Sequence, residues 1–333
     1  MHLGIKNFIG GPTRTLFGDG TYSGNIIQGG VTLQPQDYLL DGITPLAKCI
    51  VVTGAATVTP DATTRASVYS CQNLVITGAS ASLAAATNSK GLLGFVRGRV
   101  VITNGGSIHM DSLGLAGNFG NTPITSLIPA TLLKHIRTEN LAAYVLLGEG
   151  AAGAPACSRD NSYNSGVAAG PMQTGGGGTG RAGSGTAGAG GKGGPCCGGA
   201  GSGGAVHQTS PAAGAYGGPG GAAKATSFSG GGGAGNPPGA GSNGGAAALG
   251  GGGGVVGLFA PSINIAAGAF IRADGAIGGV GNYRGGAAGG GCVVIVTSTG
   301  GLTNAGTICA NGGGGTGGGW GGIGSVNTFE IAI

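Results

Sequence analysis

Short runs of β-branched and other apolar residues alternate with turn residues over the first third of the chain, from about residue 26 to residue 116. The runs are Asn25–Ile27, Val31–Leu33, Cys49–Thr53, Thr57–Thr59, Leu74–Thr77 and Val100–Thr103. Gly-Ala, Pro-Asp and Asn-Gly steps separate them. Runs of this length and composition are typical of short strands. The pattern predicts an all-β unit.

The same strand–turn–strand plan recurs in the C-terminal third of the chain. It covers residues 99–111, 257–275 and 292–312. Each copy contains glycine, a small residue, and Ile or Phe, followed shortly by Asp or Asn; the aligned triplets are Gly106–Ile108, Gly268–Phe270 and Gly306–Ile308. One such unit cannot bury an apolar face alone, so stacked copies are expected. The repeat predicts a short-strand β-solenoid or sandwich core, with Asp111 and Asp274 at equivalent turns.

A different period appears between residues 123 and 149. Apolar residues recur there at roughly helical spacing, including Leu132, Leu133 and Ile136. Pro129 can begin a helix and Gly148 can end one. The pattern predicts one short α-helix near residues 130–147, which covers a core or forms an interface rather than a site.

Long glycine runs interrupt the β pattern, at Gly175–Gly178, Gly230–Gly233 and Gly250–Gly254. Such runs form either a flexible linker or an ordered array of polyglycine II helices, which pack closely only where side chains are missing. A linker of this length inside a compact chain is unusual. The ordered array is therefore favoured, with backbone groups paired between helices.

These patterns divide the chain into three parts. Residues 1–25 are an irregular lead-in or attachment segment. Residues 26–150 form a β-rich domain that includes the helix. Residues 151–333 form a glycine-rich polyglycine II region with returning β strands. The less glycine-rich N-terminal part is the expected attachment end.

Composition narrows the classes of function. Of 333 residues, 84 are glycine, only 8% are charged and 5% are aromatic. The core must therefore be thin and built from small aliphatic residues. The net charge of +5 is spread along the chain, and no basic patch with stacking aromatics indicates nucleic-acid binding. No apolar run reaches the length of about 18 residues that membrane insertion requires, and the N-terminus carries no convincing targeting signal.

The seven cysteines are unevenly spaced and include the adjacent pair Cys196–Cys197. No CxxC pair occurs, so no metal site is expected. The favoured interpretation is buried small hydrophobic residues in a protein that is assembled in a reducing cytoplasm. Disulfides formed after release are the alternative.

The sequence contains none of the catalytic motifs that we considered. Gly191-Lys192-Gly193 lacks the Ser or Thr that follows the lysine of a P-loop. None of the ten acidic residues lies within three positions of another, although pairing in space between copies of the repeat stays open. No nucleophile elbow accompanies the histidines. We expect no catalytic residue and no cofactor.

The candidate contact residues interrupt the glycine-rich sequence. They are Tyr163, His207, Tyr216, Phe228 and Tyr283. Aromatic residues on a rigid scaffold are effective anchors for sugars or protein loops. The alternative is that they pack over the glycine array or against an adjacent subunit.

The glycine runs resemble those of bacteriophage tail-fibre and tail-tip receptor-binding proteins. The resemblance covers roughly residues 150–325 and rests on Gly175–Gly178, Gly230–Gly233, Gly250–Gly254, Gly285–Gly291 and Gly312–Gly319 with short variable interruptions. In the T-even-like fibre-tip adhesins of this family, stacked polyglycine II helices carry distal loops that bind the host. This chain departs from that pattern because β strands such as Val293–Val296 flank the glycine region.

The resemblance implies a non-enzymatic virion protein that is assembled in the host cytoplasm. Its expected partners are other tail proteins and a host surface glycan or outer-membrane protein, and a homo-oligomer, with a trimer as one option, is expected. A purely structural fibre, coat or decoration subunit is the alternative function. A surface-glycan depolymerase is the third.

Overall fold

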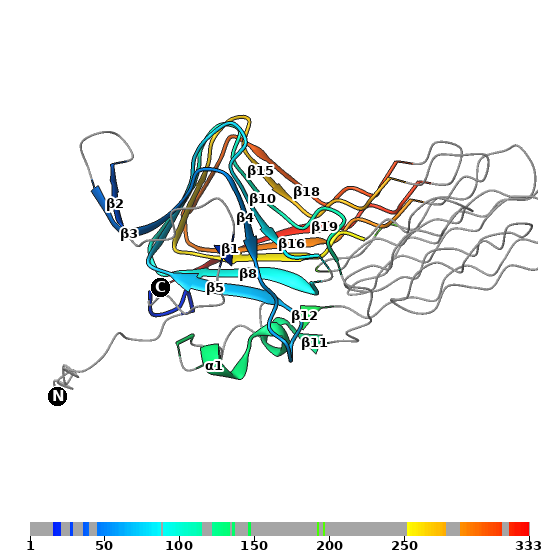
Figure 1. The fold of residues 1–333 in the computed structure, drawn as a ribbon, viewed down its shortest axis with the longest axis horizontal. Helices are drawn as coiled ribbons and strands as arrows, with labels where there is room; N and C mark the ends of the chain where they lie inside the picture. The colour runs from blue at the N-terminus through cyan, green and yellow to red at the C-terminus, as the bar shows by residue number, and fades with distance from the viewer. Residues whose placement is uncertain are drawn as a thin grey trace, which may run out of the picture.

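The computed structural model describes residues 16–20, 27–28, 36–39, 45–87, 89–114, 122–133, 135–136, 146–147, 192, 196, 252–277, 287–314 and 320–332. These residues form a mostly β structure with one short α-helix (Figure 1). The predicted all-β fold class is therefore confirmed.

Three sheets of parallel strands enclose one apolar core (Figure 1). Sheet 1 contains β3 (Pro45–Val52), β6 (Asn73–Ile76), β9 (Arg99–Ile102), β14 (Ser262–Ile265) and β17 (Leu302–Asn304). Sheet 2 contains β4 (Ala55–Val58), β7 (Ser82–Ala85), β10 (Ser107–His109), β15 (Phe270–Arg272) and β18 (Thr307–Cys309). Sheet 3 contains β5 (Ser67–Cys71), β8 (Gly91–Val96), β13 (Val255–Phe259), β16 (Cys292–Ser298) and β19 (Ser325–Ile331).

The chain visits the sheets in a fixed order. Each coil supplies one strand to sheet 1, then one to sheet 2, then one to sheet 3, and strands of successive coils pair in parallel. This is the topology of a β-solenoid. Two further strands are antiparallel: β2 (Gln36–Leu39) pairs with β3, and β1 (Ile27–Gln28) pairs with β4.

The core follows from the alternation of side chains along each strand. In sheet 2, Ile108, Ile271 and Ile308 lie in register, and Ile108 and Ile271 are fully buried. Ile308 is only partly buried, and no described strand pairs with the outer edge of its strand, β18. Small aliphatic residues make up nearly all of this core, as the composition predicts.

The sequence alignment of the repeat is wrong by one residue in its middle copy. Ser107 pairs with Phe270 and Phe270 pairs with Thr307, so Ile108 corresponds to Ile271 and not to Phe270. A one-residue shift turns a side chain to the opposite face of a strand. Phe270 therefore lies partly exposed on the outer surface.

The glycines explain this misalignment. Gly268 was matched with Gly106, but the register makes it equivalent to Gly105. Gly105 and Gly268 both have positive φ, at 81° and 77°, a conformation that glycine adopts without strain. Consecutive glycines in the first copy left the alignment ambiguous.

An irregular segment covers the outer face of sheet 3. It contains the 3-10 helix η1 (Ile124–Leu127) and the helix α1 (Ala130–Leu133), whose buried residues join the same cluster as Phe95 and Phe259. The rings of Phe95 and Phe259 stack with centroids 4.7 Å apart. The prediction that this segment covers a core is confirmed.

The predicted extent of the helix is wrong. The helix ends at Leu133, and β12 (Leu146–Leu147), which lies in the predicted range, pairs with β11 (Thr122–Pro123). The spacing of the apolar residues suggested one long helix. In the structure, a 3-10 helix followed by a short α-helix turns apolar residues toward sheet 3 at a similar spacing.

Glycine-rich excursions all leave the solenoid at the same corner, between sheet 2 and sheet 3 (Figure 1). They span residues 110–254, 273–291 and 310–324 in the third, fourth and fifth coils. The first two coils turn this corner through the short connections 59–66 and 86–90. One corner thus carries all three glycine-rich excursions.

Candidate functional site

The predicted contact residues lie outside the described residues: Tyr163, His207, Tyr216, Phe228 and Tyr283. Four of them belong to the excursion 110–254, and Tyr283 belongs to the excursion 273–291. Their role stays a prediction. The bases of the excursions that carry them are described.

The bases form a glycine lattice, which we define as residues 252–254, 273–277, 287–291, 310–314 and 320–324. Within the fourth coil, the Ala288 N–H donates to Ala276 O (3.0 Å) and the Gly291 N–H donates to Ala273 O (2.7 Å). Two bonds between the same segments therefore lie three residues apart. A β ladder repeats every two residues, whereas a polyglycine II helix repeats every three.

The fifth coil repeats this arrangement. The Gly321 N–H donates to Gly313 O (3.0 Å), and the Gly324 N–H donates to Ala310 O (2.8 Å). The three-residue period at the described bases of the excursions is the one expected of polyglycine II helices, and the array as a whole stays a prediction.

Lattice segments bond to neighbours in more than two directions. The segment 287–291 pairs with 273–276 of its own coil, donates from Gly290 N–H to Gly322 O (2.9 Å), and accepts at Gly289 O from Gly253 N–H (3.0 Å). A strand in a sheet has at most two such neighbours. The lattice therefore continues the solenoid stack and also extends sideways.

Glycine is required in the lattice by the close approach of neighbouring backbones. A Cβ on Gly291 would overlap with the carbonyl oxygen of Gly254. A Cβ on Gly324 would overlap with that of Gly291, and one on Gly313 with that of Ala276. No side chain fits between the neighbouring backbones at these three glycines.

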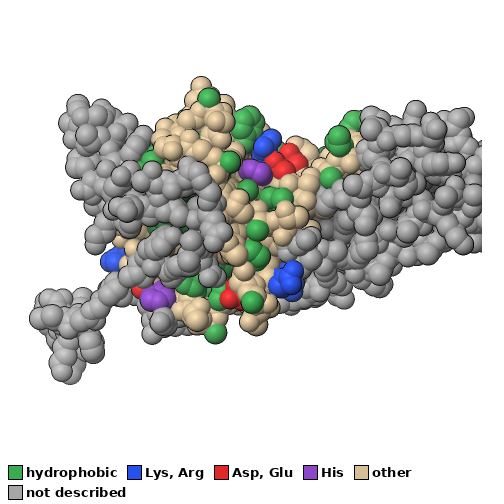
Figure 2. Space-filling view, viewed as in Figure 1, with side chains coloured by type: hydrophobic (Ala, Val, Ile, Leu, Met, Phe, Trp, Pro, Cys, Tyr) green, Lys and Arg blue, Asp and Glu red, His purple; other side chains and the backbone are tan. Residues whose placement is uncertain are grey.

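A polar ladder lies where sheet 2 meets the lattice; it consists of His109, Asp111, Arg272, Asp274 and Cys309. Figure 2 shows acidic, basic and histidine side chains gathered on this part of a surface that carries few charges. The Asp274 N–H donates to Asp111 Oδ1 (3.0 Å), which confirms that the two aspartates occupy equivalent turns. The Asn311 N–H donates in the same way to Asp274 Oδ1 (2.6 Å).

Charges within the polar ladder are paired across coils. Arg272 Nη2 lies 3.0 Å from Asp111 Oδ2, and the guanidinium also lies over the Phe270 ring at 5.2 Å from its centroid. His109 Nδ1 lies 3.7 Å from Asp111 Oδ2 and has no hydrogen-bond partner in the described structure. Burial lowers the pKa of His109; the Asp111 carboxylate opposes this shift, and Arg272 adds to it.

Cys309 is not an activated nucleophile. Its Sγ lies 3.6 Å from Asp274 Oδ2. Burial, followed by the effect of the Asp274 carboxylate, raises the pKa of the Cys309 thiol to about 12. The thiol therefore stays protonated at neutral pH, and the ladder fastens the corner of the solenoid.

Sequence reasoning found only the two aspartates of this ladder. His109, Arg272 and Cys309 occupy one register position in three successive coils. Alignment of the repeat in the correct register would have placed them together; the one-residue error hid this.

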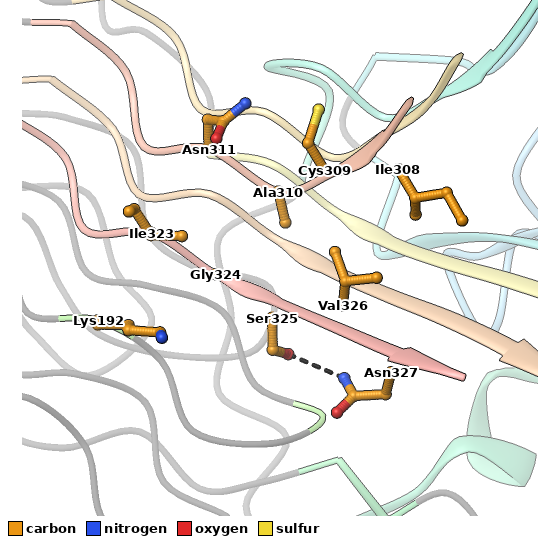
Figure 3. A pocket seen from close by; sticks show the side chains of 10 residues that line it. All are labelled: Lys192, Ile308, Cys309, Ala310, Asn311, Ile323, Gly324, Ser325, Val326 and Asn327. Atoms are coloured by element: carbon orange, nitrogen blue, oxygen red, sulfur yellow. Dashed lines mark hydrogen bonds between the residues drawn. The ribbon is translucent and has the colours of Figure 1, made fainter. Parts of the chain in front are cut away.

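A hollow of about 460 Å³ opens at the last coil, between β18 and β19 (Figure 3). Its lining is mostly apolar and small polar side chains, namely Lys192, Ile308, Cys309, Ala310, Asn311, Ile323, Gly324, Ser325, Val326 and Asn327. The hollow lies beside the end of the glycine lattice, at the open end of the stack.

The described residues contain no group of histidine, cysteine and acidic side chains that could hold a metal ion. Four of the five described cysteines are buried, in agreement with their interpretation as small hydrophobic residues. None of the described helices is long and apolar enough to cross a membrane.

Comparisons of the chain with protein-family models, with curated proteins and with solved structures found no match.

Proposed function

We propose that this chain is a non-enzymatic bacteriophage virion protein, a tail fibre or tail-tip adhesin that binds the host cell surface. The observation that carries the proposal is the three-residue hydrogen-bond period at the bases of the glycine-rich excursions. Together with the resemblance of the glycine runs to tail-tip proteins, it favours a rigid scaffold that displays contact residues at its far end.

The mechanism is preorganisation. Lattice segments bond to neighbours in several directions and pack without side chains, so the bases of the excursions are fixed by folding. Contact residues carried by an ordered support lose less conformational entropy when they bind a partner. Tyr163, His207, Tyr216, Phe228 and Tyr283 are the proposed contacts, because aromatic side chains dominate many binding surfaces.

The proposed partner is a host surface glycan or an outer-membrane protein, and other tail proteins anchor the subunit in the virion. A purely structural subunit is the alternative. Measuring phage adsorption separates the two functions. Changes in a structural subunit should impair particle assembly, whereas changes in an adhesin should impair binding to the host.

One observation favours a glycan depolymerase as a second candidate. Asp111 and Asp274 each lie two residues beyond the end of a strand, and these strands, β10 and β15, are neighbours in sheet 2. The usual spacing of neighbouring strands, about 4.8 Å, approaches the carboxylate separation of about 5–5.5 Å in retaining glycosidases. However, each of the two carboxylates accepts a backbone N–H, and Asp111 also pairs with Arg272. These contacts support a structural role for both.

Competition for phage adsorption tests the proposal. The purified chain should block adsorption to host cells, and Tyr216→Ala with Phe228→Ala should weaken this by about tenfold or more. Phe270→Ala is the matched control, because this ring lies on the solenoid surface, and it should block as well as the wild type.

Two other results would contradict the proposal. Failed particle assembly with unchanged adsorption would establish the structural alternative. Release of reducing ends from host polysaccharide, lost in Asp111→Asn and Asp274→Asn, would establish the depolymerase.

A further inference from the structure

The two ends of the solenoid differ. At the N-terminal end, β1 and β2 pair antiparallel with the first strands of sheet 2 and sheet 1 and so close these two edges. At the C-terminal end, no described strand pairs with the outer edges of β17, β18 and β19. Open strand edges are sites for pairing with another chain unless they are covered.

Exposed apolar side chains concentrate at this open end. Among the described residues, five large hydrophobic side chains are exposed, and four of them lie in the last two coils: Ile277 (72%), Trp320 (60%), Ile323 (53%) and Val326 (42%). Val293, which precedes Val326 in register, is fully buried. The fifth, Leu133 (38%), lies on the cover of sheet 3.

The lattice segment of the last coil, 320–324, carries bulky residues where the equivalent segment of the coil before it, 287–291, carries small ones. The register of β16 with β19 makes Ile323 equivalent to Gly290 and Trp320 equivalent to Ala287. A Cβ on Gly290 would overlap with Ala310 O of the following coil. Ile323 therefore projects in the direction that a following coil would occupy.

The projecting side chains lie next to the hollow between β18 and β19. Ile323 and Val326 line this hollow together with Ile308 and Ala310 (Figure 3). A projecting apolar group lies at the same end as a hollow whose lining includes the apolar side chains of Ile308 and Ala310. Across a two-fold axis each copy then offers the other what it receives.

We propose that two copies of this chain dock end to end through their last coils, with Trp320 and Ile323 of each copy packed into the hollow of the other. The partner end is the same end, because the projecting side chains and the hollow that receives them both lie on it. The assembly therefore stops at two copies and does not grow into a fibre. This inference is independent of the proposed host-binding function.

The last strands carry few charges that would oppose docking of two copies through their last coils. Glu330 is the only charged residue in β17, β18 and β19, and one of its carboxylate oxygens accepts the Gly300 N–H (3.1 Å). Lys192, of opposite sign, borders the hollow. Thr328 follows Ile295 in register, so the last coil is also more polar than the one before it, which limits the apolar area that a free copy exposes.

The single tryptophan of the chain makes the contact measurable. Light scattering of the full chain should give the mass of a dimer at micromolar concentration, and Trp320 emission should shift to shorter wavelength as the dimer forms. Val326→Asp and Ile323→Asp should each raise the dissociation constant by about tenfold or more. Leu133→Asp places the same charge on the exposed residue outside the interface and should leave the dimer intact.

Trp320→Ala is a second test that adds no charge. It should weaken the dimer in light scattering while circular dichroism stays that of the wild type. A wild-type chain that stays monomeric, forms a trimer, or dimerises equally well with Val326→Asp overturns the proposal.

Discussion

The sheets of the solenoid and the glycine lattice solve the same packing problem with opposite residues. In the sheets, side chains such as Ile108 and Ile271 fill the space between backbones, and the pattern repeats every two residues. In the lattice, backbones approach at glycines such as Gly291 and Gly324 until no Cβ fits, and hydrogen bonds recur every three residues. A core of side chains tolerates a lost methyl group better than a lattice of backbones tolerates an added one.

The two arrangements meet at a single corner. Ala273 directly follows β15, is fully buried in the solenoid core, and accepts the lattice hydrogen bond from Gly291. Met110 and Ala310 hold the equivalent positions in the adjacent coils and accept from Gly254 and Gly324. The change from the two-residue period of the strands to the three-residue period of the lattice therefore takes place within one or two residues of each strand end. The polar ladder stabilises the backbone at this point.

The largest effect should come from adding a methyl group inside the lattice. Gly291→Ala places a Cβ against the carbonyl oxygen of Gly254 and the backbone of Gly253, and should cost about 3 kcal/mol or more in the free energy of unfolding. Gly314→Ala is the matched control, because the nearest atom to its Cβ, in Trp320, is 3.7 Å away. Urea denaturation of both variants checks the difference; equal losses would contradict the account of the lattice.

The next effect comes from removing side-chain volume in the sheets. Ile271→Ala leaves a cavity in a fully buried site and should cost about 3 kcal/mol. Phe270→Ala, one residue earlier and on the outer face, should cost about 1 kcal/mol. Thermal unfolding measures both, and the reverse order would support the original alignment of the repeat over the observed register.

A smaller effect is expected in the polar ladder. Asp274→Ala removes the acceptor of the Asn311 N–H and should cost about 1–2 kcal/mol, whereas Asp274→Asn keeps a carbonyl oxygen there and should cost less. Both changes remove the carboxylate that helps to raise the pKa of Cys309, so alkylation of this thiol at pH 9 should be faster in both. Unchanged alkylation would exclude a contribution of the carboxylate to the pKa.

The smallest effect is a pH dependence from His109. Burial lowers its pKa in the folded state from the ordinary 6.5, so the unfolded chain binds more protons as the pH falls through that value. The free energy of unfolding should therefore decrease on acidification. His109→Gln should remove about 1 kcal/mol or less of this decrease between pH 7 and pH 5, as measured by denaturation at both pH values. A larger decrease in the variant would reverse the sign of the pKa shift.

The stacked β strands could be predicted in part from the sequence, because the strand–turn–strand pattern repeats along the chain. Strands β6 and β9 are β-branched runs between turns and were found directly. Strands β5 and β8 were not found, because they are buried on both faces and therefore show no alternation of polar and apolar residues. The glycine array was predicted because only glycine permits such close backbones. The divisions at residues 25 and 150 stay predictions.

The candidate site shows the limit of the same reasoning. The equivalence of Asp111 and Asp274 followed from the repeat. The association of His109, Arg272 and Cys309 required the register, because residues from three coils become neighbours only when the coils stack. The open end with Trp320 and Val326 also required the structure, since exposure depends on which coil is the last.

The sequence by itself determined the local conformations: short β strands where branched residues recur, and close-packed extended backbone where glycine recurs. These follow from steric properties of single residues. The tertiary structure decided which faces are buried, where the excursions leave the solenoid and which end stays open. Those properties depend on the register between coils, and a shift of one residue, which hardly changes local preference, reverses the face of every side chain in a strand.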